Sequence, residues 1–139
     1  MTSTDGRPRA DVELRLPADG AYASLLRTTT AGLAARLDFT IDDIEDLRIA
    51  ASEAGALVLP EAEAGTDLLC EYFLQPGRLT LRLSVRAASP GVPDRDSFGW
   101  QVLSTLATAA TAETTADRLT VSVTMESALA TPRDARAPG

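Results

Sequence analysis

The 139-residue sequence contains no histidine, no lysine and no asparagine, and all 13 of its basic residues are arginine. Without histidine it cannot form a Ser-His-Asp triad, a Cys-His pair or an imidazole metal site. Without lysine it has neither a Schiff-base amine nor a P-loop lysine. Carboxylates, hydroxyl groups, arginine and backbone remain, and these groups favour binding and regulation over self-contained catalysis.

Cysteine and long apolar runs are also scarce. The single cysteine, Cys70, excludes an intrachain disulfide and a thiolate zinc cluster, and its apolar strand context predicts an inert core thiol. The sequence has no run of about 18 apolar residues, and residues 1–9 are polar, without the apolar segment of a signal peptide. We therefore expect no membrane association, and the free thiol predicts a reducing, cytoplasmic location.

The chain is acidic, with 20 aspartates and glutamates and a formal net charge of -7. An acidic surface argues against nucleic acid as the main ligand, because phosphate binding needs a basic face. It is compatible with a basic protein partner. The length and the 45% hydrophobic content fit one domain, which we place at residues 11–126, with flexible tails at residues 1–10 and 127–139.

Hydrophobic periodicity predicts the elements of this domain. Strands are indicated where apolar and polar residues alternate, in residues 12–16, 68–74, 79–85 and 119–125. Pro76 and Gly77 predict a type II turn between the two middle strands. Residues 87–96 form a loop with two prolines and a glycine.

Helical spacing predicts three helices between these strands. The first covers residues 21–37, the second is capped by Thr40 and stopped by Pro60, and Ser97 caps the third. The second helix has a predicted buried stripe of Ile41, Ile44, Leu47, Ala51, Ala54 and Val58. The order β-α-α-β-β-α-β, with strands apolar on one face, predicts an α/β (α+β) two-layer sandwich with a mostly antiparallel or mixed sheet.

Two segments resemble motifs of a known family. Residues 46–54, Asp-Leu-Arg-Ile-Ala-Ala-Ser-Glu-Ala, resemble the start of the N box of the GHKL (Bergerat-fold) ATPases. Residues 97–103, Ser-Phe-Gly-Trp-Gln-Val-Leu, resemble the segment that closes the nucleotide lid in that family. Together with the order of the elements, these motifs extend the resemblance over about residues 11–126. It is greatest to the RsbW-like anti-sigma factors, and among them to the divergent actinobacterial branch of UsfX type. These are small serine kinases that sequester a sigma factor.

The resemblance assigns roles within the N box. Glu53 stands at the position of the family's base or water-orienting glutamate. Leu57 replaces the asparagine that helps to hold Mg²⁺, and its isobutyl group offers no oxygen ligand. We interpret Glu53 as a relict base and expect no metal site. The alternative is a solvated helix residue, because a base without its metal has little to activate.

The glycine-rich boxes are altered as well. Ala87 replaces the aspartate that accepts the adenine amino group, and Ser89 replaces a glycine, whereas Gly91 is kept. In the lid motif Ser97 replaces a glycine and Gly99 is kept. An unpaired buried adenine donor would cost about 1–3 kcal/mol, so we expect weak or absent binding of ATP and Mg²⁺ and no cofactor. Alternatively, Gly91 and Gly99 are ordinary glycines of a loop and of a helix start.

Several other residues are candidates for contacts with a partner protein. The resemblance aligns Arg27 with a partner-contacting arginine, while the alternative is a solvent-facing helix arginine. Phe98 and Trp100 are expected to be core residues or interface anchors. An acidic cluster is formed by Asp42, Asp43, Glu45 and Asp46. It predicts the start of a helix, where the helix dipole favours negative charge, and the alternative is a docking surface.

The resemblance implies an anti-sigma factor that sequesters an alternative sigma factor with a degenerate nucleotide site. Its implied partners are the sigma factor, an antagonist of the anti-sigma factor and a second copy in a homodimer. On this interpretation the chain is not an enzyme. Three alternatives stay open: an active ATP-dependent serine kinase that phosphorylates the antagonist, a GHKL-like interaction module in another partner-switching pathway, and an enzyme on an unrelated α/β sandwich. The missing histidine, lysine and asparagine disfavour the last of these.

Overall fold

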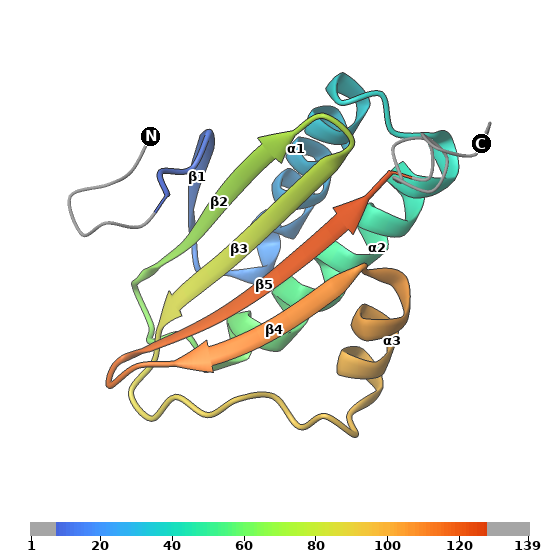
Figure 1. The fold of residues 1–139 in the computed structure, drawn as a ribbon. Helices are drawn as coiled ribbons and strands as arrows, with labels where there is room; N and C mark the ends of the chain where they lie inside the picture. Colours follow the sequence, from blue (N-terminus) through green and yellow to red (C-terminus); the bar gives the residue numbers. More distant parts are fainter. Residues whose placement is uncertain (1–7, 128–139) are drawn as a thin grey trace.

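A computed structural model describes residues 8–127, which form a sheet of five antiparallel strands with helices on one of its faces (Figure 1). The strands are β1 (Val12–Pro17), β2 (Asp67–Gln75), β3 (Arg78–Arg86), β4 (Ala109–Thr114) and β5 (Arg118–Glu126), in the sheet order β1-β2-β3-β5-β4. The helices are α1 (Ala23–Arg36), α2 (Ile41–Val58) and α3 (Phe98–Leu106). The predicted two-layer sandwich is confirmed. The predicted tails fall largely on residues 1–7 and 128–139, which lie outside the described residues.

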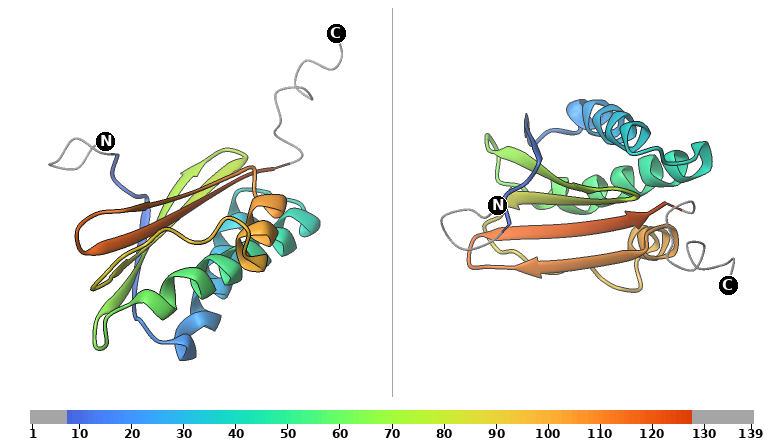
Figure 2. Two further views of the ribbon diagram at one scale, coloured as in Figure 1. Left: turned by 90° about the horizontal axis from the view of Figure 1, so that it is seen from below. Right: turned by 45° about the horizontal axis from the view of Figure 1, so that its top comes forward.

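Alternation along the central strands explains the two layers. The helix-facing side chains are wholly or almost wholly buried, and they include Leu79, Leu81, Leu83 and Val85 of β3 and Leu119, Val121, Val123 and Met125 of β5. The opposite face is polar, and its cross-strand hydroxyl pairs include Thr80 with Thr124 at 2.9 Å and Ser84 with Thr120 at 3.1 Å. The helices therefore cover only the apolar side of the sheet, as Figure 2 shows.

The middle hairpin has the predicted turn. Gln75 pairs with Arg78 across the two-residue connection of Pro76 and Gly77. Gly77 has a φ of 72°, which the second central residue of a type II turn requires. Ser127, the last described residue, is buried and its N–H donates to the Gly77 carbonyl at 2.8 Å. This bond joins the end of β5 to the hairpin.

The strand β4 is missing from the sequence prediction. Its residues, Ala-Ala-Thr-Ala-Glu-Thr, contain no large apolar side chain, so the alternation that marks the other strands is absent. The pairing with β5, from Ala109 opposite Thr124 to Thr114 opposite Leu119, defines the strand instead. Strand β4 thus depends on a tertiary partner rather than on its own hydrophobic pattern.

Helix α2 begins and ends as predicted. The Thr40 hydroxyl accepts the Asp43 N–H at 3.1 Å, and the α-helix ends at Val58, two residues before Pro60. The predicted buried stripe is wrong at Ile41, which is 84% exposed. Ile41 precedes Leu47 by six residues and so lies about 120° around the helix from this core residue. No helix in residues 8–127 combines the length and the apolar character needed to cross a bilayer.

Helix α1 follows a short 3₁₀ turn (Gly20–Tyr22), so the predicted helix over residues 21–37 is present in two parts. The hydroxyl of Thr30 lies 2.7 Å from the Leu26 carbonyl and 2.7 Å from the Tyr72 hydroxyl. The side chains of Thr30 and Tyr72 are both buried, and this network satisfies their hydroxyl groups. The network connects α1 to β2.

Candidate functional site

The residues of the N-box resemblance lie where the start of α3 meets α2. Glu53 and Leu57 are four positions apart and therefore share one side of α2. A Cβ atom placed on Gly99 would lie 3.2 Å from Oε1 of Glu53 and 3.6 Å from Cδ2 of Leu57. The structure thus brings Glu53, Leu57 and Gly99 together. The absence of a side chain at Gly99 allows the close approach of the two helices.

The chemistry at this contact is one carboxylate beside hydrocarbon. Glu53 is half-buried, and its carboxylate makes no hydrogen bond or ion pair with any residue in the described part of the chain. Leu57 is partly buried and packs against the hydrophobic core. Within residues 8–127, no three cysteine, aspartate or glutamate side chains gather as a metal ion would need. This arrangement offers Mg²⁺ a single side-chain ligand of the type it prefers.

The segment after β3 departs from the contact between α2 and α3. Ala87 is buried, and its N–H donates to the Asp117 carbonyl in the turn between β4 and β5 at 2.9 Å. Ser89 and Gly91 are exposed, and a Cβ atom on Gly91 would meet nothing within 4 Å. Gly91 therefore does not permit a close approach as Gly99 does, and an alanine methyl group stands where the resemblance places the adenine acceptor.

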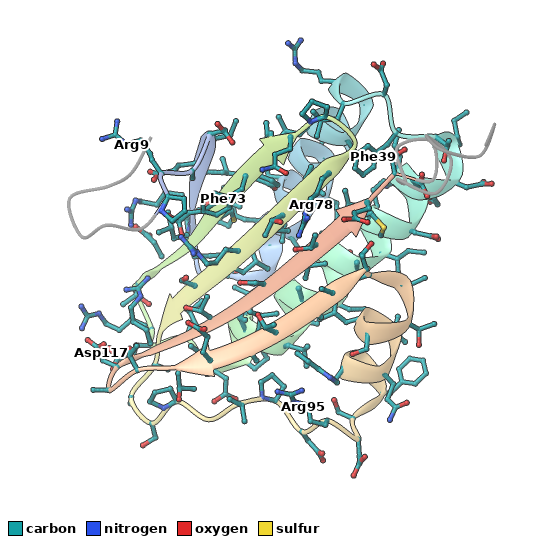
Figure 3. The ribbon with its side chains drawn as sticks, in the orientation of Figure 1. Arg9, Phe39, Phe73, Arg78, Arg95 and Asp117 are labelled. Carbon is teal, nitrogen blue, oxygen red and sulfur yellow. The ribbon has the colours of Figure 1, made fainter. Side chains whose placement is uncertain are left out.

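Ser97, which replaces a glycine of the lid motif, starts α3. Its hydroxyl accepts the Trp100 N–H at 3.2 Å, so the predicted N-cap is confirmed. Arg95 lies on the loop that leads into α3 (Figure 3). Its guanidinium is 4.7 Å from the centre of the Trp100 ring. This cation–π contact connects the loop to the helix. It could not be predicted, because loop residues follow no fixed spacing relative to a helix face.

The aromatic residues of α3 have opposite environments. Trp100 is 5% exposed and belongs to the core, whereas Phe98 is 80% exposed. Of the two expected roles, core residue or interface anchor, Trp100 therefore has that of a core residue. Cys70 is fully buried in β2, and burial raises the pKa of its thiol to about 12, in agreement with the inert core thiol predicted from the sequence.

Arg27 lies on α1, away from α3. Its side chain is half-buried and forms no ion pair with any of residues 8–127. Leu25, two residues earlier, is 48% exposed, and Tyr22 in the preceding turn is 39% exposed. The start of α1 therefore presents an unpaired cation close in sequence to exposed apolar groups, a composition found at protein interfaces.

Comparison with known sequences identifies relatives over part of the chain, although no protein-family model matches it. The serine-protein kinase RsbW of Bacillus cereus (strain B4264) is 37% identical over 81 residues, which cover 58% of this chain and 49% of that protein. The serine-protein kinase RsbW of Bacillus thuringiensis (strain Al Hakam) is 43% identical over 81 residues with the same coverage. The chain therefore spans about half the length of the curated relatives it matches.

Comparison with solved structures gives the fold. The RsbU and RsbW domains of Rv1364c from Mycobacterium tuberculosis superpose with a TM-score of 0.64 at 19% identity. The match covers 87% of this chain and 33% of that chain. At this identity the likeness establishes the architecture and does not extend to activity.

Proposed function

Because this chain is an RsbW-like protein with the GHKL fold, we propose that it is an anti-sigma factor with a degenerate nucleotide site. In this proposal residues 11–126 are the functional domain and hold an alternative sigma factor by protein–protein contacts alone. The single observation that carries the proposal is the contact of Gly99 with Glu53 and Leu57. It supports a site in which hydrocarbon has replaced a magnesium ligand and the two helices have closed on each other.

The residues present do not fit a magnesium–nucleotide. Mg²⁺ requires oxygen ligands in near-octahedral geometry, and Leu57 supplies a hydrocarbon side chain beside Glu53. At the base site, the methyl group of Ala87 accepts no hydrogen bond from an adenine amino group. Gly91 and Gly99 are the glycines left from the nucleotide-binding motifs, and Ser89 and Ser97 stand where glycines are expected. Glu53 has no defined catalytic role in this proposal.

Sequestration by contact follows from the surface chemistry. The net charge of -7 attracts the basic surfaces of a sigma factor and speeds their encounter. Tight holding needs a desolvated anchor, and Arg27 is suited to this role because it has no partner within the described residues. The proposed active unit is a homodimer, from which an antagonist protein releases the sigma factor by competition.

The test begins with capture of partners from the native cell by the tagged full chain, followed by identification and reconstitution of the sigma factor. Replacement Arg27→Ala should weaken the reconstituted complex at least tenfold, because interface arginines contribute disproportionately. Replacement Arg36→Ala, at the exposed end of the same helix, is the matched control and should change affinity less than twofold. Failure to bind any sigma factor would refute the function. An unchanged affinity in Arg27→Ala would refute the role of Arg27.

An ATP-dependent serine kinase is the second candidate, and the name serine-protein kinase of the relatives favours it. Incubation of the chain with labelled ATP, Mg²⁺ and the antagonist distinguishes the two. Phosphate transfer to a serine of the antagonist would replace the first proposal by the second. Capture of a partner of another class, without a sigma factor, would indicate an interaction module of a different partner-switching pathway.

A further inference from the structure

An apolar groove lies on the surface between α2 and α3. Phe98, Val102 and Leu106 recur every four residues along α3 and line one side, while Ile49 of α2 lines the other. Phe98 is 80% exposed and Ile49 is 42% exposed, so two large apolar side chains of this groove face solvent. The stripe from Phe98 to Leu106 extends for about 12 Å along the helix, which is slightly more than two helical turns.

The rim of this groove is acidic. Glu53 marks the side of α2 that faces α3, because its carboxylate lies beside Gly99. Asp46 and Asp42 precede Glu53 by seven and eleven residues, which places them on the same side of the helix. Asp96 lines the groove just before α3 begins. None of these four carboxylates pairs with an arginine of residues 8–127.

The opposite side of α2 has a different character. Ile44, Glu45 and Arg48 face α1 across a second groove, and there Arg48 forms an ion pair with Glu45 at 3.1 Å. Acidic residues without a cation partner are therefore arranged on the α3 side. An apolar floor with an acidic rim is complementary to an amphipathic helix with basic flanks.

We propose that the groove between α2 and α3 is the docking site for one amphipathic helix of the sequestered sigma factor. The helix presents apolar residues at spacings of three and four to Phe98, Val102, Leu106 and Ile49. Arginine or lysine residues on its flanks face Asp42, Asp46, Glu53 and Asp96. This inference rests on the proposed function and adds to it the surface that holds the partner.

The groove and Arg27 form two separate contact points. Helix α2 packs against both α1 and α3, so it separates the surface of α1 from the groove (Figure 2). A partner that engages both points crosses the outer surface of the helix layer. Loss of either contact then weakens the complex, and loss of both weakens it by about the product of the two effects.

The experiment uses the full chain and the sigma factor that the capture identifies, with affinity measured by biolayer interferometry. Replacement Phe98→Asp should weaken binding at least 30-fold, because it replaces the most exposed residue of the apolar stripe by a charge. Val92→Asp is the matched control, since Val92 is also an exposed apolar residue, at 53%, but belongs to the preceding loop. It should change affinity less than twofold. Circular dichroism and thermal unfolding establish that both variants fold.

A charge variant tests the rim independently. The double replacement Asp46→Asn with Glu53→Gln should slow association at least threefold and reduce its dependence on salt. Glu61→Gln, which neutralises an exposed carboxylate just beyond α2, should leave both unchanged. Equal effects of the two charge variants would overturn the proposed rim.

The outcomes separate this inference from the function on which it rests. If the wild-type chain binds no sigma factor, the proposed function fails. If it binds one and Phe98→Asp binds equally well, the groove proposal fails while the function stands. If Phe98→Asp loses binding of the antagonist and keeps binding of the sigma factor, the groove is assigned to the antagonist. A change from dimer to monomer in sedimentation, with sigma binding intact, would assign it to a second copy. Either result overturns the proposal.

Discussion

Gly99 is the residue that determines how α3 sits on α2. Its Cα faces the carboxylate of Glu53 and the branched side chain of Leu57, and a Cβ atom there would be in tight contact with the former. Helix periodicity could predict that Glu53 and Leu57 share a side of α2. It could not predict that Gly99 would lie against them, because that contact depends on the path of the loop between β3 and α3.

Substitutions at Gly99 should separate small from large side chains. Gly99→Ala should change the free energy of unfolding by less than about 0.5 kcal/mol, because the flexible Glu53 carboxylate can move and alanine favours the helix. Gly99→Leu should destabilise by about 1–3 kcal/mol, because its side chain cannot fit against Leu57 without displacing α3. Urea unfolding followed by Trp100 fluorescence measures both. Equal stability of the two variants would contradict the close approach.

The buried thiol predicts loss of stability at alkaline pH. Burial raises the pKa of Cys70 from 9.0 to about 12, so between these values the folded chain retains a proton that the unfolded chain releases. The free energy of unfolding should therefore fall as pH rises from 9, by up to about 1.4 kcal/mol per pH unit from this group. Burial also raises the pKa of Tyr72, which adds to the loss above pH 10.

The measurement is urea unfolding at pH 8, 9, 10 and 10.5, compared with the variant Cys70→Ala. The variant should lose less stability over this range, because the remaining alkaline loss no longer includes the thiol. At pH 8 the native thiol should also react with Ellman's reagent far more slowly than in urea. Rapid reaction of the native chain would show that Cys70 is accessible and would remove the basis of the prediction.

At the scale of the elements, the sequence predicted those parts whose signals are local. Thr40 and Pro60 bound α2, and Pro76 with Gly77 makes the hairpin turn, because caps and turns depend on neighbouring residues. Strand β4 was missed, because its alanines and threonines become a strand only through pairing with β5. Ile41 was misplaced for a related reason, since the first turn of a helix can extend beyond the core that it serves.

In the candidate site, too, local features could be predicted from the sequence and tertiary contacts could not. The cap at Ser97 was predicted from its position before an apolar stripe and is confirmed. The opposite environments of Phe98 and Trp100 were not predicted, because two aromatic residues at the start of a helix do not reveal which side faces the sheet. Their assignment requires the packing of α3 on α2, so the structure is needed to place Phe98 in the groove.

Helix α3 should depend on its cap. Ser97→Ala removes the acceptor of the Trp100 N–H and should lower the free energy of unfolding by about 0.5–2 kcal/mol. Ser97→Asp, which supplies another good capping group, should retain most of the stability. Thermal unfolding by circular dichroism provides the comparison. A similar loss in both variants would contradict a capping role and would indicate that the serine acts through another contact.

For the whole molecule, both proposed partner contacts lie on the helix layer rather than on the open face of the sheet. On the open sheet face Arg82 lies 4.8 Å from the centre of the Phe73 ring and bonds Glu71 at 3.0 Å. On the helix layer, by contrast, Arg27 and the acidic rim of the groove have no charged partners among the described residues. These unpaired groups lie beside exposed apolar side chains such as Leu25 and Phe98, which is why both proposed partner contacts lie on the helix layer.

The central claim is that this chain works without a magnesium–nucleotide, and calorimetric titration with ATP and Mg²⁺ tests it most directly. The wild-type chain should give no saturable heat up to millimolar nucleotide, because neither Leu57 nor Ala87 supplies the polar group that the site requires. The double variant Leu57→Asn with Ala87→Asp, which restores both groups, is the comparison and should bind more tightly than the wild type. Saturable micromolar binding of ATP and Mg²⁺ to the wild-type chain would contradict the account.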